Sequence, residues 1–398
     1  GENVDQNIPL KRLPLYPLFI SLIFKLFGSN NLLVLLLTQS LLGFITFYYL
    51  IKTLEILKID RSIIILSTLL LNLSIIFRFS VFLPNCLFIF FITLFTYSFT
   101  NFYFNKKIKY LLYTCLYLFL LMLTRANFAV SIFSTIPIIC FFIFRQDYKK
   151  IIKLQLIFAL FISYFSAVGV QYYRYYSKIG NVAYTTQSGL HLILWTLPCL
   201  STKYGCGARN LTTHKILNDR YNQIINESEY ELDEVERNEI AKNVGVNYII
   251  NDMNKNEALI SSFFSFSKLF LHSSLTEIYP SLGIDVINPS VQKGESFKEK
   301  IISFVFLGIT DFKYLLWLIA IIFVFISRLF QLYAIIVYLK PNILRLYVFV
   351  LTSMMFSTII PAIGIGNPRY RSDSETLFLI IGALGINSFF KKKEDRIK

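Results

Sequence analysis

The sequence feature with the clearest chemical potential is Arg369-Tyr370-Arg371, in which two arginines flank one tyrosine. Each guanidinium group presents a planar fork of N–H donors that matches the oxygens of a phosphate. The triplet therefore predicts a phosphate clamp. The other interpretation is that both arginines extend to a membrane interface and pair with Asp373 and Glu375, which follow closely in the chain.

Two further cationic motifs lie earlier in the chain. Arg12 precedes Tyr16, which stands between two prolines in the segment 11–17. In one interpretation, this segment places cationic groups and a stiff proline turn on the same side of the membrane as Arg369-Tyr370-Arg371. In the other, it is only an anchored loop. Arg125 comes directly after an apolar run. It belongs to the same set of cationic groups, or it holds neighbouring helices together.

The composition indicates what kind of fold must position these residues. Of the 398 residues, 55% are hydrophobic and only 16% are charged, and the mean hydropathy is +0.57. Soluble proteins carry about 25% charged residues, so a soluble enzyme and a secreted disulfide scaffold are both disfavoured. A net charge of +15 would suggest nucleic acid, but the basic residues lie in short clusters between apolar runs. We expect an all-α polytopic membrane protein whose partner is the lipid bilayer and not a nucleic acid.

Apolar runs of about 20 residues can cross the roughly 30 Å of hydrocarbon in a bilayer. The sequence contains nine such runs, six before a long polar loop and three after it, so we predict nine transmembrane helices. They cover residues 30–51, 62–78, 84–104, 109–124, 127–145, 153–173, 314–338, 345–364 and 375–390.

The charge of the connecting segments predicts the orientation of these helices. One set of connections, which includes the C-terminal tail, holds 17 basic residues, whereas the short connections of the opposite set hold four. The positive-inside rule therefore puts the C-terminus in the cytoplasm. The predicted organisation is an extracytoplasmic segment over 1–29, a six-span bundle over 30–173, a mainly helical extracytoplasmic loop region over 174–313, a three-span bundle over 314–390 and a basic cytoplasmic tail over 391–398.

The N-terminal segment would lie outside the cell, yet nothing before residue 30 could carry it across a membrane. We therefore expect one further span upstream of Gly1, and the alternative is a mature terminus left by cleavage of a signal peptide. The stretch 10–27 is apolar but contains Pro14 and Pro17, which are expected to break so short a helix. It is predicted to lie in the outer interface and not to cross the membrane.

The long loop region is expected to contain helices at 213–227 and 231–250. Ser228 and Glu231 have the spacing of a capping box, in which two side chains satisfy free N–H groups of a first helical turn. We therefore predict that Ser228 and Glu231 cap the second helix.

Two apolar stretches of the same region, 259–271 and 297–307, are expected to lie along the membrane or to cover the mouth of the bundle. Cys199 and Cys206 are close in the chain and would form a disulfide if the compartment is oxidising.

The sequence has no pattern of an established cofactor site. Its three histidines, His191, His214 and His272, show no metal-ligand spacing, and neither a Walker-type loop nor a dinucleotide-binding glycine pattern is present. We predict no zinc site and no nucleotide cofactor. Dependence on a divalent metal stays open, because the acids of the chain are too scattered to define a site.

In their order along the chain, these motifs resemble the GT-C membrane glycosyltransferases, in particular the bacterial branch related to protein mannosyltransferases and to the lipid A aminoarabinose transferase. The resemblance covers nearly the whole chain. Its three parts are Arg12-Leu13-Pro14-Leu15-Tyr16-Pro17 with Leu26-Phe27-Gly28, then Leu123-Thr124-Arg125, and finally Gly366-Asn367-Pro368-Arg369-Tyr370-Arg371, which is similar to the family's Arg-Tyr-Arg motif before its last span.

The resemblance implies an enzyme that moves a sugar from a polyprenyl-phosphate donor to a glycan, lipid or protein acceptor. It also implies that this transfer takes place on the extracytoplasmic face of a bacterial inner membrane. The substrate-binding residues that it implies are Arg12, Arg369 and Arg371 on the donor phosphate, Tyr16 and Tyr370 lining the site, and Arg125 at the end of a middle span.

The chain departs from the family pattern in two places. The family's catalytic acid lies just after the first span, which we expect upstream of this chain, and Asp5 is the candidate acid in the N-terminal segment besides Glu2. Ser372-Asp373-Ser374-Glu375 replaces the apolar and proline residues usual after Arg-Tyr-Arg. This second departure indicates a different acceptor, or drift in a degenerate gene.

Two other functions are compatible with the sequence. One is a non-enzymatic transporter or flippase for lipid-linked saccharides, for which Arg328 in the middle of a predicted span is the main indication, although no internal repeat is present. The other is a truncated, inactive relative that keeps the scaffold without the catalytic acid.

Overall fold

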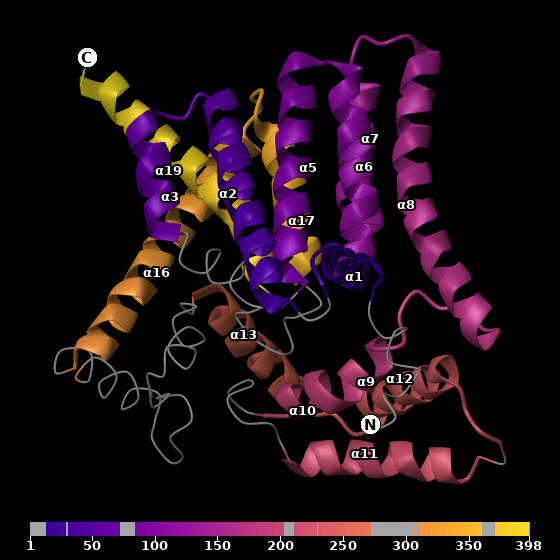
Figure 1. Ribbon diagram of the computed structural model, residues 1–398. Coiled ribbons are helices and arrows are strands. Elements are labelled where there is room, and N and C mark those ends of the chain that lie inside the picture. Colours follow the sequence, from indigo (N-terminus) through magenta and orange to yellow (C-terminus); the bar gives the residue numbers. More distant parts are fainter. Residues whose placement is uncertain are drawn as a thin grey trace.

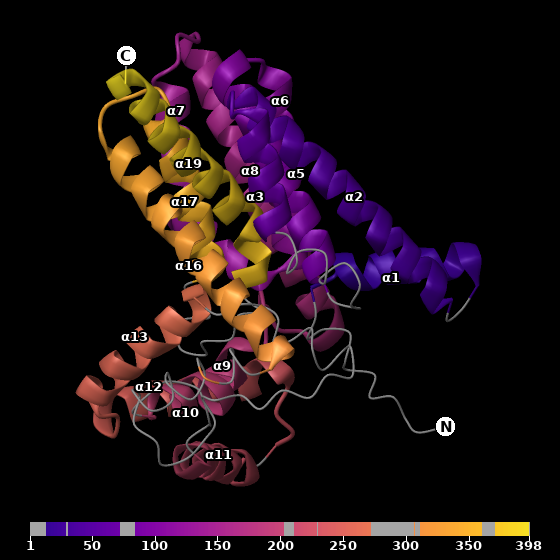
Figure 2. The ribbon, with the colours of Figure 1, turned by 90° about the vertical axis from the view of Figure 1, so that its left-hand side faces the viewer.

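The computed structural model is built from helices. It describes residues 13–28, 31–71, 84–202, 211–228, 230–271, 306, 311–359 and 371–397, and these contain no strand. The prediction of an all-α fold is confirmed. Figure 1 shows a bundle of long helices above a layer of shorter ones, and Figure 2 shows the same two layers from the side.

The bundle packs around α5, which is mostly enclosed by its neighbours, whereas α2, α8 and α16 turn most of their surface outward. The bundle helices are α2 (Leu32–Ile56), α3 (Arg61–Leu71), α5 (Asn85–Asn105), α6 (Ile108–Thr124), η1 (Ala126–Phe133), α7 (Thr135–Phe144), α8 (Lys150–Ile179), α16 (Phe312–Leu339), α17 (Arg345–Ile359) and α19 (Glu375–Ile397).

The outward faces of the bundle are apolar. Leu37 and Phe44 on α2 and Phe158 on α8 are among many large side chains left exposed. A continuous apolar surface of this kind would drive association in water, whereas lipid tails are as apolar as these side chains. The outer surface of the bundle is therefore suited to a bilayer.

By length and composition, four helices of the described residues can cross a membrane, namely α2, α5, α8 and the part of α16 from Tyr314 to Leu339. The pair η1 and α7, bent by 42° at its break, adds a fifth if it is counted as one span. Each of the nine predicted ranges overlaps a helix, but the prediction of nine spans is not confirmed.

The other helices within the nine predicted ranges are not candidate membrane spans, for different physical reasons. α6 has 17 residues, and the described parts of α3 and α17 have 11 and 15, all fewer than the about 20 needed to cross the hydrocarbon. The predicted ranges 62–78 and 345–364 run on into residues outside the described part. α19 carries Glu375 at its first residue and lysines from Lys391 onward.

Helix α1 (Leu15–Phe27) corrects the prediction that its two prolines break the helix. Pro14 is its N-cap residue, and Pro17 lies in its first turn, where N–H groups have no acceptor within the helix, so a missing N–H is tolerated. The helix has 13 residues, too few to cross a bilayer, and it lies across one end of the bundle (Figure 2).

The second layer has a small core of its own, separate from that of the bundle. It lies at the same end of the bundle as α1 (Figure 1). Gly189 allows close packing within it, because a Cβ atom there would lie 2.2 Å from the backbone oxygen of Asn238. The elements are α9 (Ser188–His191), η2 (Leu192–Thr196), α10 (Leu197–Leu200), α11 (Leu211–Asn226), α12 (Glu234–Asn251) and α13 (Lys255–Leu271).

The helices predicted at 213–227 and 231–250 are α11 and α12, but the predicted capping box is wrong. The Asp233 side chain accepts hydrogen bonds from the N–H groups of Val235 and Glu236, and the Glu236 side chain accepts one from the Asp233 N–H. Ser228 instead donates to the Tyr230 carbonyl. Both pairs have the same spacing, and the aspartate directly before the periodic helix forms the cap.

Replacing Asp233 by alanine is expected to lower the free energy of unfolding of the second layer by about 1 kcal/mol, since two first-turn N–H groups lose their acceptor. Thermal denaturation in detergent would measure the change, with Ser228→Ala as the matched control. An equal effect of both substitutions would contradict the observed cap.

Of the two apolar stretches expected to cover the bundle, 259–271 belongs to α13, which lies against its end next to α16. The other stretch, 297–307, lies outside the described residues except for Phe306. α13 is the element of the second layer that brings its last turn to the site described below.

Helices α16 and α19 approach closely because α19 carries two glycines at the contact. A Cβ atom at Gly385 would lie 2.0 Å from the backbone oxygen of Phe330, whereas one at Gly382 would have its nearest neighbour, Gln331, at 3.5 Å. Small residues at a helix interface allow such backbone contact in membrane proteins. The contact fixes α19, and with it Glu375, against Arg328 of α16.

Candidate functional site

The residues predicted to bind substrate fall partly within the described chain. Tyr16, Arg125 and Arg371 are described: Tyr16 lies in α1, Arg125 directly follows α6, and Arg371 contacts α13 of the second layer. The other three, Arg12, Arg369 and Tyr370, lie outside the described residues, and so does Asp5, the candidate catalytic acid.

Arg125 forms an ion pair with a carboxylate far along the chain. It ends α6, and its Nη1 lies 2.8 Å from Oδ2 of Asp373 in the short helix η5 (Ser372–Ser374). Asn85, the first residue of α5, donates to the other carboxylate oxygen of Asp373 at 2.6 Å. Both oxygens of this buried carboxylate therefore have a donor, as a buried charge requires.

Tyr16 is connected to the first turn of α5 through Gln39, which contacts Cys86, the residue after Asn85. Gln39 of α2 donates to the Tyr16 hydroxyl at 3.0 Å and lies 3.2 Å from the Cys86 sulfur. Burial, followed by the Cys86 thiol, raises the pKa of Tyr16 to about 12. The hydroxyl is therefore protonated at neutral pH and can serve as a neutral hydrogen-bonding group.

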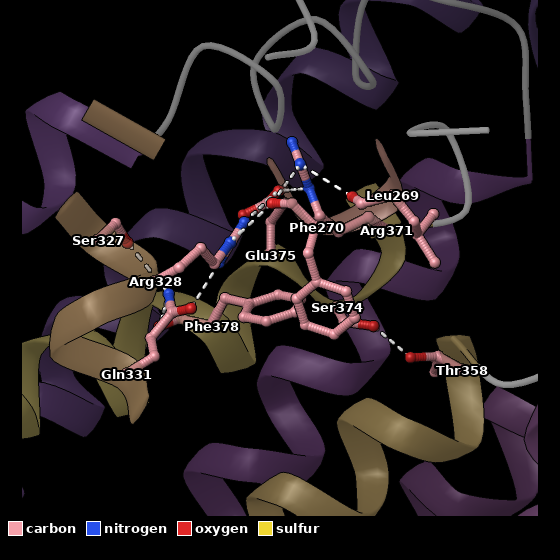
Figure 3. A network of polar contacts seen from close by, with 10 residues as sticks. All are labelled: Leu269, Phe270, Ser327, Arg328, Gln331, Thr358, Arg371, Ser374, Glu375 and Phe378. Carbon is pink, nitrogen blue, oxygen red and sulfur yellow. Dashed lines mark hydrogen bonds and ion pairs between the residues drawn. The ribbon is translucent and has the colours of Figure 1, made fainter. Parts of the chain in front are cut away.

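Arg371 is buried in a network of polar contacts, shown in Figure 3. Its Nε lies 2.5 Å from Oε1 of Glu375, and its Nη1 donates to the carbonyls of Leu269 and Phe270 at 3.0 and 3.1 Å. The pairing with Glu375 matches one part of the alternative interpretation of the motif. The other predicted acid, Asp373, pairs with Arg125 instead.

Arg328 of α16 joins the same network, although the sequence offered it only as an indication of transport. Its Nη2 lies 3.4 Å from Oε1 of Glu375, its Nε donates to the Phe270 carbonyl at 3.1 Å, and its Nη1 donates to Gln331 at 2.7 Å. The guanidinium carbon lies 3.9 Å from the ring centroid of Phe378, a cation–π contact. A charged residue in the middle of a long apolar helix was the signal that could have placed it in the site.

These contacts form one basic centre at the end of the bundle. Within the described residues it brings the guanidinium groups of Arg125, Arg328 and Arg371 together with the carboxylates of Asp373 and Glu375. Interactions between charges are stronger in such a buried place than in water. The arrangement can therefore attract and orient an anion, and the fork geometry of arginine favours a phosphate.

Among the described residues, no group of three or more histidine, cysteine or acidic side chains could hold a metal ion. Cys199, one of the two cysteines expected to pair, is disulfide-bonded and fully buried in α10. Its predicted partner, Cys206, lies outside the described residues.

Comparison with known proteins gives one family match. Residues 9–171 match the family of dolichyl-phosphate-mannose-protein mannosyltransferases, which is less than half of the chain. The matched range includes Arg12, Tyr16 and Arg125 and ends long before Arg371. No curated protein and no solved structure matches the chain.

The apolar helices and this family match together indicate an integral membrane protein. The resemblance to the GT-C membrane glycosyltransferases was inferred from motifs and is supported independently by the match. Over residues 9–171, the chain carries the sequence signature of the dolichyl-phosphate-mannose-protein mannosyltransferase family.

Proposed function

We propose that the chain is a GT-C membrane glycosyltransferase that moves a sugar from a polyprenyl-phosphate donor to a glycan, lipid or protein acceptor. The observation that carries this proposal is the basic centre. Arg125 and Arg371, which lie far apart in the sequence, are brought to one end of the bundle together with Arg328.

The charge of the centre suits the leaving group of such a reaction. The acceptor oxygen forms a bond to the anomeric carbon, and the bond between that carbon and the phosphate oxygen breaks. Its electron pair leaves with the polyprenyl phosphate, on which negative charge develops. Guanidinium groups aimed at that charge stabilise the transition state. Arg371 takes this role in our proposal, with Arg369 and Arg12 beside it, while Tyr16, Tyr370 and Arg125 line the site.

The reaction also needs a base to take the proton of the acceptor hydroxyl. Asp373 and Glu375 already bind arginines, so they are poor candidates for this role. We assign it to an acid of the N-terminal segment, for which Asp5 is the candidate besides Glu2. A divalent metal near that acid belongs to the same proposal.

We further propose a bacterial plasma membrane with the C-terminus in the cytoplasm and the second layer outside. The arrangement of charges supports this orientation. The connections between α2 and α3, between α5 and α6, between α7 and α8 and between α16 and α17 lie with the C-terminus at one end of the bundle (Figure 1). These connections are the lysine-rich ones, which favours the cytoplasmic side.

The proposal is tested by transfer of a labelled sugar from a polyprenyl-phosphate donor by the full-length protein in liposomes. Arg371→Ala is expected to lower kcat/KM by about 10²–10³-fold, the usual loss on removing one donor to developing charge. The matched control is Arg220→Ala, which removes an exposed arginine paired with Asp252 in the second layer.

Because Arg371→Ala also removes buried contacts, Arg371→Lys serves as a second variant that keeps the charge and loses the fork. Thermal denaturation shows whether each variant is folded. Undiminished transfer by folded Arg371→Ala would overturn the assignment of Arg371 to the donor phosphate.

A lipid-linked saccharide transporter is the second candidate. It is favoured by the 42° break between η1 and α7 and by Arg328 within a candidate span, because broken helices and buried charges mark transport pathways. Movement of a fluorescent polyprenyl-phosphate sugar across liposomes without any transfer to an acceptor would favour this function over glycosyl transfer.

A further inference from the structure

The end of the bundle opposite the second layer carries two connections in which basic residues outnumber acidic ones (Figure 1). The first joins α5 to α6 and, with the start of α6, covers residues 106–109. The second joins α7 to α8 and, with the start of α8, covers residues 145–153. The first contains three lysines and no acid, and the second contains four basic residues and one acid, Asp147. We call these seven basic residues the cationic patch.

The two connections are held together at Lys106. The Tyr148 hydroxyl donates to the Lys106 carbonyl at 2.5 Å, so the second connection lies against the first. Nζ of Lys106 lies 4.3 Å from the ring centroid of Phe142 in α7 and 5.2 Å from that of Tyr103 in α5, and both are cation–π contacts. The charges of both connections therefore belong to one surface.

The positive charges of the cationic patch are not balanced within the described residues. None of the ion pairs that these residues form includes a member of the patch. Lys153 instead donates to the Phe144 carbonyl at 2.8 Å. Lys107 and Lys149 are the N-cap residues of α6 and α8, where the helix dipole disfavours a positive charge. Because like charges on one surface repel one another, an external anion would stabilise the patch.

Exposed apolar side chains lie next to the cationic patch on the same helices. Phe141 and Phe144 belong to the last turn of α7, and the guanidinium carbon of Arg145 lies 4.8 Å from the ring centroid of Phe141. Ile151 and Leu154 lie at the start of α8, and the four apolar side chains are between 48% and 65% exposed. The surface thus passes from positive charge at the helix ends to apolar groups along the helices. A phospholipid presents the complementary order, a charged headgroup followed by acyl chains.

We infer that the cationic patch binds an anionic phospholipid, with its headgroup phosphate on Arg145, Lys149 and Lys150 and its acyl chains along Phe144 and Leu154. The contacts are ion pairs, hydrogen bonds and apolar packing, and no covalent bond changes. A headgroup with a net negative charge balances the patch, whereas a choline headgroup carries a cation of its own. This site lies at the other end of the bundle from the basic centre and does not depend on the proposed sugar transfer.

The test measures binding of dioctanoyl phosphatidylglycerol to the full-length protein in a nonionic detergent by native mass spectrometry. Dioctanoyl phosphatidylcholine is the zwitterionic control and is expected to bind more weakly. The double variant Lys149→Gln with Lys150→Gln is expected to raise the Kd for phosphatidylglycerol about tenfold, equivalent to about 1.4 kcal/mol, and to leave that for phosphatidylcholine unchanged. Equal binding of both lipids by the unaltered protein would overturn the inference.

The matched control is Lys58→Gln with Arg61→Gln, which removes two exposed charges from the α2–α3 connection at the same end of the bundle. Basic residues at this end are expected from membrane topology alone, and the control separates that general role from a binding site. Weaker binding by the α8 variant alone supports the site. Equal weakening by both double variants would mean that only net charge matters, and the inference would be wrong.

Tyr148→Phe tests whether the two connections form one site. It keeps every charge and removes the hydrogen bond to the Lys106 carbonyl, so it is expected to raise the Kd for phosphatidylglycerol about threefold, as the loss of one hydrogen bond would. Unchanged binding by this variant would contradict a joint site. Glycerol phosphate, which has the charge without acyl chains, is expected to compete poorly, and competition as strong as that of the lipid would also contradict a phospholipid site.

Discussion

Replacing Arg125 by methionine is expected to lower the free energy of unfolding by about 3–5 kcal/mol, because the substitution leaves the Asp373 carboxylate buried without its cation. The Asp373 side chain is 3% exposed, so water cannot replace the lost guanidinium group. Asn85 keeps its hydrogen bond to the other oxygen, but a neutral amide does not compensate a full charge. Thermal denaturation of the full-length protein in detergent measures the loss.

A second substitution in a double-mutant cycle separates the effect of the Asp373 charge from the effect of lost packing at Arg125. Asp373→Asn in the Arg125→Met background removes the carboxylate charge that Arg125 had balanced, while its Oδ1 can still accept from Asn85, so most of the lost stability is expected to return. Arg220→Met, which breaks an exposed ion pair with Asp252, is the control and is expected to change stability by less than about 1 kcal/mol. A double variant no more stable than Arg125→Met would show that the arginine acts through packing and not through its charge.

Local patterns in the sequence were sufficient to predict helices. Runs of apolar residues and alternating charges predicted helices in each of the nine ranges. The common side of the three cationic motifs stays a prediction, and the structure brings Arg125 to Asp373, two residues after Arg371. Hydropathy was less able to predict how far each helix extends. α8 continues to Ile179, past the predicted end at 173, until Gly180 adopts the left-handed conformation that ends a helix.

The partners of the arginines could not be predicted from spacing alone. Glu375 follows Arg371 by one helical turn, so their contact was within reach of a sequence argument. Asp373 instead pairs with Arg125, which precedes the long loop region in the sequence, whereas Asp373 follows it. Arg328 contacts Glu375 from a different helix. Such contacts depend on how helices pack, and helical periodicity carries no information about which neighbours meet.

The two acidic residues after Arg371, Asp373 and Glu375, form ion pairs in the structure, a role that the sequence analysis did not assign to them at the departure from the family pattern. The departure at Ser372-Asp373-Ser374-Glu375 was interpreted as a sign of another acceptor or of drift. In the structure Asp373 binds Arg125 at the end of α6, and Glu375 binds two buried arginines, Arg328 of α16 and Arg371 directly before η5. The segment therefore joins three parts of the bundle at the candidate site, a role that needs both charges.

Replacing Gly385 by alanine is expected to lower the free energy of unfolding by about 2–3 kcal/mol. The new Cβ atom would lie 2.0 Å from the Phe330 backbone oxygen, so one of the two helices must shift. In a helix, alanine is more favourable than glycine by about 1 kcal/mol. A net loss of stability must therefore come from the close contact between the new Cβ atom and Phe330. Gly382→Ala, whose Cβ has its nearest neighbour at 3.5 Å, is the matched control and is expected to be neutral or slightly stabilising.

The same substitution also tests how the site is assembled. Arg371 and Glu375 belong to one segment and stay together when α16 moves away, whereas Arg328 at 3.4 Å is carried off with α16. Gly385→Ala is therefore expected to lower kcat/KM for sugar transfer, while Gly382→Ala leaves it unchanged. Equal transfer by both glycine variants would show that the α16–α19 contact does not position Arg328 for the reaction.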